Sequence, residues 1–198
     1  MALFLPRFNL VFIHIYKTAG TATRLALMKE DRGYSEIGGS HADYKEVSEN
    51  LDLFKKSTFS IVRNPYEWIY SVYQYAKNYD SHPFHKYCNS HNFSNFVDWY
   101  FDNKKELEKS VNGKLQSQTE YLSDENGIKV NYVLKMENLQ TDFNSMFDVL
   151  RYRNIILGND NTTPYIKGTW SKEADKDAIN RINLEYKNDF KNFNYNMI

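Results

Sequence analysis

The chain has 198 residues, and its 25 Lys and Arg residues are balanced by 25 Asp and Glu residues. This balance excludes a general attraction to nucleic acid or to membranes, so an anionic ligand must be held by a local group of basic side chains. Hydrophobic residues make up 41% and aromatic residues 16%, which excludes a disordered chain and predicts one domain spanning residues 1–198.

The cysteine content and the N-terminus both indicate a reducing compartment. The single cysteine, Cys88, excludes an internal disulfide framework. Residues 1–7 lack the long apolar core of a signal peptide, and no stretch is as long as a membrane span. We therefore expect a cytoplasmic protein that has no nucleic-acid or membrane partner. The sequence does not indicate an oligomeric state.

The first predicted unit is a strand, a tight turn and a helix. Residues 10–15 form an apolar strand, residues 17–20 form the turn, and residues 21–30 form the helix. Such a turn presents backbone N–H groups where a phosphate binds well, and Lys17 adds a positive charge. It is not a Walker A loop, because the glycine-rich stretch before the lysine is absent. Taken alone, the pattern equally suits an ordinary turn with a surface lysine.

The second unit repeats this order. Residues 57–62 form a buried strand that ends at Arg63, and a helix follows. Asn64 is a suitable N-cap, with Pro65 in the first turn and Glu67 at the capping-box position. The apolar face of this helix is formed by Ile69, Val72, Tyr73 and Ala76, and Ser71 lies off that face.

Both cationic loops are expected at one edge of the sheet, since the carboxyl ends of parallel strands meet there. Arg63 and Ser71 are suited to hold a second phosphate through a charged fork and a hydroxyl. Two phosphate sites at one edge suggest a ligand with phosphates at both ends, such as an adenosine 3′,5′-bisphosphate.

The remaining elements complete an α/β pattern. We expect a short helix after His41, an irregular polar loop over residues 78–92, a helix from Ser94, and a charged, exposed segment over residues 104–114. A third strand covers residues 131–136, a helix covers 142–151, and one last helix begins at Ser171. The alternation predicts a single-domain three-layer α/β sandwich with a mainly parallel central sheet and a P-loop-like phosphate-binding loop.

Two segments together resemble the paired signature of the PAPS-dependent sulfotransferases, in which PAPS is 3′-phosphoadenosine 5′-phosphosulfate. They are residues 12–21 (Phe-Ile-His-Ile-Tyr-Lys-Thr-Ala-Gly-Thr) and residues 59–71 (Phe-Ser-Ile-Val-Arg-Asn-Pro-Tyr-Glu-Trp-Ile-Tyr-Ser). The likeness is closer to the carbohydrate (family 2) branch than to the phenol and steroid branch. Residues 132–139 and 186–195 also resemble segments of that family.

The resemblance implies a role for each loop. The 5′-phosphosulfate would be wrapped by Lys17, Thr18, Ala19, Gly20, Thr21, Ala22 and Thr23, with the backbone N–H groups of residues 19–22 on the phosphate. Lys17 would neutralise the bridging oxygen as the S–O bond breaks, and Arg63 and Ser71 would hold the 3′-phosphate. One departure is Tyr16, which stands where the family usually has proline.

His41 is the candidate general base. It follows two glycines and a serine, and Gly-x-His-Ala-Asp resembles the base segment of the family. A histidine pKa suits that task, and Asp43 is a candidate to orient the ring. The alternative is a surface loop histidine. His14, on the first strand, is expected to be a core histidine near the site.

A second group of histidines suggests a rival site. The residues His82, His85, Cys88 and His91 recur every third position, which is compatible with zinc. The polar, proline-containing surroundings favour solvated side chains, and the family needs no metal, so we expect none. The aromatic residues between 73 and 100 are expected to be mostly core.

The predicted function is therefore transfer of the sulfuryl group of PAPS to a hydroxyl of a glycan or small metabolite, releasing adenosine 3′,5′-bisphosphate. The alternatives are a kinase-like phosphotransferase and a non-catalytic module that binds adenosine bisphosphate. Acceptor specificity is expected in the loops after Gly33 and over residues 78–92 and 114–121. Residues 161–167 are expected to close over the adenine or the sugar.

Overall fold

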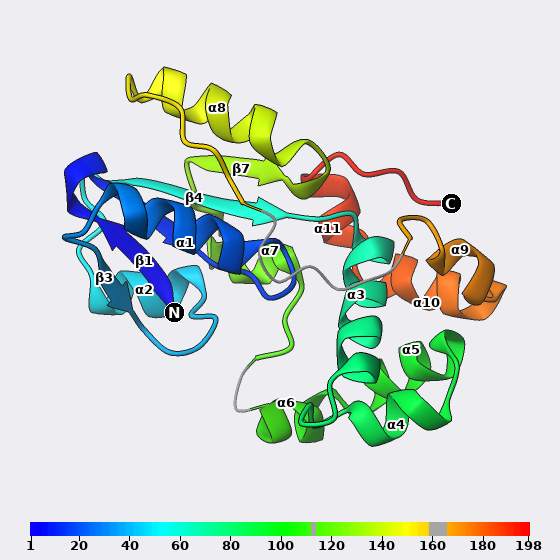
Figure 1. Cartoon of the computed structure of the whole chain (residues 1–198). Helices are drawn as coiled ribbons and strands as arrows, with labels where there is room; N and C mark the ends of the chain where they lie inside the picture. The colour runs from blue at the N-terminus through cyan, green and yellow to red at the C-terminus, as the bar shows by residue number, and fades with distance from the viewer. Residues whose placement is uncertain (112–113, 159–165) are drawn as a thin grey trace. The chain divides into compact units, whose positions relative to one another are not determined.

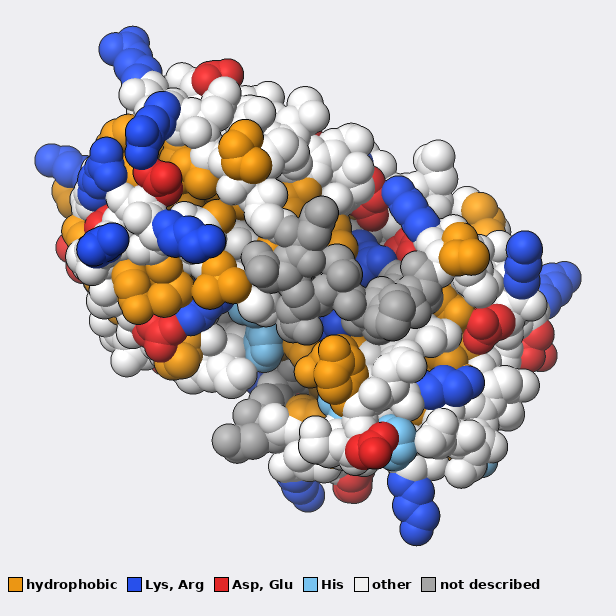
Figure 2. All heavy atoms as spheres, viewed as in Figure 1, with side chains coloured by type: hydrophobic (Ala, Val, Ile, Leu, Met, Phe, Trp, Pro, Cys, Tyr) orange, Lys and Arg blue, Asp and Glu red, His pale blue; other side chains and the backbone are white. Residues whose placement is uncertain are grey.

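The computed structural model describes residues 1–111, 114–158 and 166–198. The chain divides into two compact units, which are described separately. The first unit comprises residues 1–63 and 118–162, and the second comprises residues 64–117 and 163–198. Among the described residues, no helix is both long enough and apolar enough to cross a membrane. On the face shown in Figure 2, basic and acidic side chains are interspersed, as the balanced composition predicts.

The first unit is built on a five-stranded sheet (Figure 1). Its spatial order is β3-β1-β2-β4-β7, formed by Ser35–Ile37, Ala2–Leu5, Leu10–Ile13, Ser57–Val62 and Tyr132–Lys135. The pairs β2·β4 and β4·β7 are parallel, whereas β1 is antiparallel to both β2 and β3. Four strands therefore point one way, and the predicted mainly parallel sheet is confirmed.

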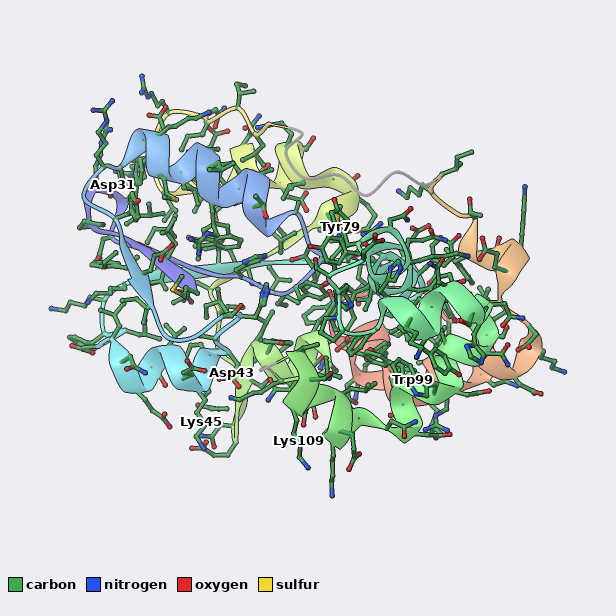
Figure 3. The ribbon with its side chains drawn as sticks, turned by 60° about the horizontal axis from the view of Figure 1, so that its bottom comes forward. Asp31, Asp43, Lys45, Tyr79, Trp99 and Lys109 are labelled. Atoms are coloured by element: carbon green, nitrogen blue, oxygen red, sulfur yellow. The ribbon has the colours of Figure 1, made fainter. Side chains whose placement is uncertain are left out.

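Helices lie on both sides of this sheet. Helix α1 (Gly20–Glu30) and helix α2 (Tyr44–Asn50) are on opposite sides, as the turned view of Figure 3 shows. The other helices of the unit are α7 (Gln118–Tyr121) and α8 (Leu139–Val149), and the short strands β5 (Ser123–Asp124) and β6 (Gly127–Ile128) form a hairpin. Helix α8 begins three residues before its predicted start, directly after a 3-10 turn over Met136–Asn138.

One apolar cluster holds the sheet, α1 and α8 together. It contains residues of β1, β2, β4 and β7 and residues of both helices, among them Phe12, Phe59, Leu134, Leu27, Phe143 and Phe147. The rings of Phe12 and Phe59 stack with centroids 4.7 Å apart across the β2·β4 pair. Burial of this cluster fixes the register of β2 against β4, because a shift by one residue would turn each strand's core face to the opposite side.

The second unit is helical. Its helices are α3 (Pro65–Asn78), α4 (His85–Ser90), α5 (Phe93–Asp102), α6 (Lys104–Val111), α9 (Trp170–Glu173), α10 (Lys176–Glu185) and α11 (Lys187–Asn192). The predicted cap of α3 is confirmed, since the side chain of Asn64 accepts hydrogen bonds from the backbone N–H groups of Tyr66 and Glu67. Several buried aromatic rings form the core, including those of Tyr66, Tyr73, Phe93, Phe96, Tyr186 and Phe190.

Two predictions for this unit are wrong, while the charged segment after residue 104 forms α6 and is half-buried or exposed apart from Leu107. The loop over residues 78–92 contains α4. The last helix is broken into three. The carboxylate of Asp175 accepts from the backbone N–H of Ala178 and starts a new helix, while Ala174 before it is extended. A side chain that caps a helix competes with helix continuation, which explains the break.

Candidate active site at the ends of β2 and β4

The turn after β2 contains two residues in the left-handed region directly before α1. Lys17 and Ala19 both have left-handed backbone conformations, with φ of 61° and 60°. Ala19 is the N-cap residue of α1, and its side chain makes no capping hydrogen bond. The first N–H groups of a helix have no acceptor within the helix, and they carry the positive end of its dipole. The start of α1 is therefore suited to a phosphate or sulfate group.

Two threonines shape this loop from within. The hydroxyl of Thr18 donates to the carbonyl of Ile15 at 2.9 Å, and that of Thr23 donates to the carbonyl of Ala19 at 3.1 Å. Both side chains are buried, whereas Thr21 is exposed. The buried threonines thus stabilise the turn that presents the backbone N–H groups.

The structure brings the two predicted cations of the first unit together. Because β2 and β4 are parallel neighbours, their following loops leave the same edge of the sheet. The guanidinium Nη1 of Arg63 donates to the carbonyl of Lys17 at 3.5 Å. Burial, followed by the charge of Arg63, lowers the pKa of Lys17 to about 8. An anion bound between the two cations would relieve their repulsion.

A buried glutamine holds the backbone of Arg63. The Gln118 side chain accepts from the Arg63 N–H at 2.7 Å and donates to the Arg63 carbonyl at 2.8 Å. Gln118 is fully buried at the start of α7. Gln118 was not predicted from the sequence, because one glutamine in an irregular segment carries no periodic signal.

His14 packs directly against the first residue of α1. A Cβ atom placed on Gly20 would lie 1.7 Å from Nε2 of His14, so no larger residue fits at position 20 without moving the ring. Burial, followed by the charge of His41, holds the pKa of His14 well below its usual value. His14 is therefore a neutral, half-buried histidine next to the loop, in line with the prediction of a core histidine near the site.

His41 lies beside His14. Its Nδ1 is 3.3 Å from the backbone carbonyl of His14. A carbonyl only accepts hydrogen bonds, so Nδ1 carries the proton and Nε2 retains the lone pair that a base uses. Burial lowers the pKa of His41 to about 4, the bond to the His14 carbonyl raises it in part, and the positive charges of the N-terminus and Arg24 lower it further.

The carboxylate of Asp43 accepts from the backbone N–H of Glu46 at 2.9 Å and caps α2. Its suggested role in orienting the His41 ring stays a prediction. The same holds for the pairing of Arg63 with Ser71, because the two residues belong to different units. Ser71 is 1% exposed, in the second turn of α3. Of the segment expected to close over the cofactor, residues 161–165 lie outside the described residues.

The histidines of the rival zinc site have other contacts. His85 Nδ1 is 3.1 Å from the Ala76 carbonyl, and the ring of His91 stacks on Tyr87 with centroids 4.0 Å apart. Burial raises the pKa of the Cys88 thiol to about 12, which disfavours the thiolate that a metal requires. In the part of the chain that the structure describes, no three His, Cys, Asp or Glu side chains are grouped to hold a metal.

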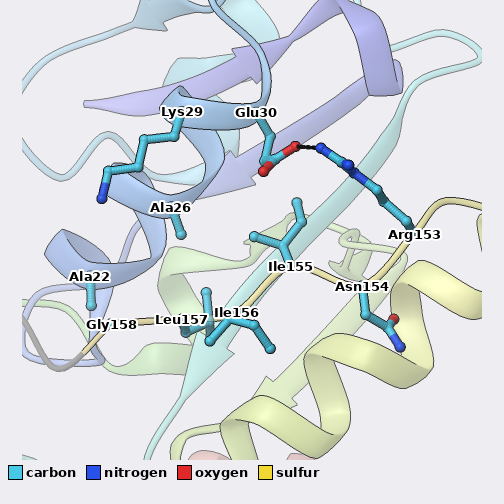
Figure 4. A pocket seen from close by; sticks show the side chains of 10 residues that line it. All are labelled: Ala22, Ala26, Lys29, Glu30, Arg153, Asn154, Ile155, Ile156, Leu157 and Gly158. Atoms are coloured by element: carbon cyan, nitrogen blue, oxygen red, sulfur yellow. Dashed lines mark hydrogen bonds and ion pairs between the residues drawn. The ribbon is translucent and has the colours of Figure 1, made fainter.

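A cavity of about 440 Å³ lies beside α1 (Figure 4). One wall is formed by Ala22 and Ala26 of α1, and the opposite wall by residues 155–158. Glu30 and Arg153 form an ion pair at 2.6 Å at one side of it. Ala22 lines the cavity and also belongs to the predicted phosphate-binding loop, so the cavity lies next to that loop.

Comparison with known families identifies the family of the chain. The model of a family described as the sulfotransferase family matches residues 1–196. Searches of the curated proteins and of the solved structures gave no match. The match spans both signature segments, and the predicted resemblance to the family 2 branch is confirmed. The chain therefore belongs to the sulfotransferase family, whose members are enzymes that transfer a sulfuryl group to an acceptor.

Proposed function

We propose that the protein transfers the sulfuryl group of PAPS to a hydroxyl of a glycan or small metabolite. The observation that carries this proposal is that Arg63, after β4, contacts Lys17, in the turn after β2 (the Lys17 loop, residues 17–23). Both lie at the carboxyl edge of these two parallel strands. This arrangement supports a binding site for a compact, highly charged anion, and the family assignment makes the sulfuryl donor the first choice.

Each end of the donor has a proposed partner. The 5′-phosphosulfate is bound by the residues from Lys17 to Thr23, mainly through backbone N–H groups at the start of α1. Arg63 and Ser71 bind the 3′-phosphate. The adenosine occupies the cavity beside α1, whose volume of about 440 Å³ lies in the range of small-ligand pockets.

The reaction requires one bond to form and one to break. The acceptor oxygen attacks the sulfur, and the bond between sulfur and the bridging oxygen of the 5′-phosphate breaks. Lys17 stabilises the negative charge that develops on this bridging oxygen. Nε2 of His41 accepts the proton of the acceptor hydroxyl. Positioning and charge stabilisation supply most of the rate, as in phosphoryl transfer.

The pKa values of Lys17 and His41 suit these roles. Lys17, with a pKa of about 8, is mainly charged at pH 7, and a bound anion raises its pKa. His41, with a pKa of about 4, is neutral at pH 7 and able to accept a proton, and a nearby polyanion raises its basicity. The single buried cysteine supports our proposal of a cytoplasmic location.

The test is transfer of ³⁵S from labelled PAPS over a panel of glycans, phenols and alcohols. We expect label on at least one acceptor. His41→Ala should lose turnover and retain binding of adenosine 3′,5′-bisphosphate. The control His91→Ala, which changes a residue at the end of α4, should have normal turnover. Turnover retained by His41→Ala would assign the base to another residue. Binding of the bisphosphate without transfer to any acceptor would favour the non-catalytic module, and transfer of phosphate from ATP would favour the kinase.

A further inference from the structure

The imidazole of His41 is enclosed by two other aromatic rings of the first unit. The ring of His14 meets it with centroids 4.7 Å apart and an interplanar angle of 62°. The ring of Tyr16 meets it at 5.2 Å and 75°. Both contacts are edge-to-face, the arrangement that aromatic pairs prefer.

The backbone of His41 is also constrained. Its φ is 56°, in the left-handed region, which is uncommon for a residue with a side chain. Such conformations persist only where the surrounding structure determines them. At this position the surrounding contacts are the Nδ1 bond to the His14 carbonyl, the two ring contacts, and the hydrogen bond from the Ala42 N–H to the Gly39 carbonyl at 3.2 Å that closes the turn.

We propose that Tyr16 is a positioning residue for His41: its ring, together with His14, clamps the imidazole so that Nδ1 stays on the His14 carbonyl and Nε2 is the nitrogen left for the acceptor proton. The clamp rests on the proposed role of His41 as the base. Tyr16 immediately precedes Lys17, so one short segment sets both the group that stabilises the leaving oxygen and the group that takes the proton.

The clamp also accounts for the electrostatics of His41. Two rings against the imidazole exclude water, and burial is the largest cause of its lowered pKa. The charged and titratable groups around it are the N-terminus before β1, Arg24 on α1 with its partner Glu36 on β3, Glu46 on α2, and His14. The positive charges of the N-terminus and Arg24 disfavour a positive charge on His41. Both groups remain when Tyr16 is replaced, so they continue to lower the pKa of His41 in the variants.

A histidine-ring NMR titration tests the clamp without any substrate. The chain has five histidines, and His41→Gln identifies the signal of His41. In the wild type we expect the His41 pKa near 4. In Tyr16→Ala we expect it to rise toward 6.5, because water reaches the ring, and in Tyr16→Phe we expect it to stay low, because the ring is kept. Tyr34→Ala, which removes another half-buried tyrosine of the same unit, serves as the control for general loss of packing.

Kinetics provide the second readout. In Tyr16→Ala we expect kcat to fall at least tenfold while the Kd for adenosine 3′,5′-bisphosphate changes less than twofold, and Tyr16→Phe should restore most of the kcat. The clamp is refuted if Tyr16→Ala leaves the His41 pKa unchanged, or if Tyr16→Phe raises it as much as Tyr16→Ala does. Absence of transfer by the wild type would refute the proposed function alone, since the titration does not depend on it.

Discussion

Lys17 is the residue on which the proposed chemistry depends most. It is half-buried, follows a buried strand and lies next to Arg63, and burial together with the charge of Arg63 lowers its pKa to about 8. We expect Lys17→Ala and Arg63→Ala each to weaken binding of adenosine 3′,5′-bisphosphate by about 1.5–3 kcal/mol, roughly 10- to 150-fold in Kd, as for loss of a charged hydrogen-bonding partner. Isothermal titration calorimetry measures this.

The matched control for these two variants is Lys45→Ala. Lys45 is an exposed lysine of α2 in the same unit, and Figure 3 shows it away from the start of α1. Its removal changes the net charge equally and should leave Kd unchanged. Unchanged binding in both Lys17→Ala and Arg63→Ala would contradict the proposal that these residues bind the two phosphate groups of the ligand.

His41 also predicts a pH dependence of stability. Its pKa is about 4 in the folded protein and about 6.5 when unfolded, so the unfolded chain binds more protons between these values. The free energy of unfolding therefore falls as the pH is lowered from 6.5 to 4. His41→Gln should reduce this slope by up to about 1.4 kcal/mol per pH unit, measured by urea unfolding at several pH values. Equal slopes in both proteins would contradict the buried, neutral state of His41.

At the residue scale, the sequence predicted the candidates but not their contacts. The Lys17 loop and Arg63 are neighbours because they follow two parallel, adjacent strands, and each strand is followed by a basic residue. The contacts of Tyr16 and His14 with His41, and the support of Arg63 by Gln118, join segments 25 or more residues apart. A local pattern contains no information on such pairs.

At the scale of elements, the strands β2, β4 and β7 were predictable, because each is a short run rich in β-branched, aromatic and other apolar residues. Strand β1 was missed because its apolar run is short and ends at a proline turn over Pro6–Phe8. The three-way break of the last helix was missed because the apolar stripe continues across Asp175, while the capping bond decides the local structure.

The cavity beside α1 gives a prediction at the same scale. Ile156 lines it and is 79% exposed, while Val149 on α8 is 67% exposed and lines no part of it. We expect Ile156→Ala to weaken binding of adenosine 3′,5′-bisphosphate by about 1 kcal/mol, roughly fivefold, through lost apolar contact. Val149→Ala should have no effect on binding, and neither change should alter the melting temperature appreciably. Equal Kd values for the two variants would place the adenosine elsewhere.

At the scale of the whole molecule, the family assignment covers both units, since it extends over residues 1–196. Of the residues proposed to bind the donor, Lys17 and Arg63 belong to the first unit and Ser71 to the second. That both units act as one domain stays a prediction from chain length. A ligand that binds the folded chain stabilises it by mass action.

The melting temperature with different nucleotides therefore tests the central claim most directly. At a concentration of about 100 times Kd, adenosine 3′,5′-bisphosphate should add about 2.7 kcal/mol of stability, a rise of roughly 5–10 °C for a chain of this size. ATP with magnesium should raise the melting temperature much less, because it lacks the 3′-phosphate. A larger rise with ATP and magnesium than with the bisphosphate would contradict the account and favour a kinase.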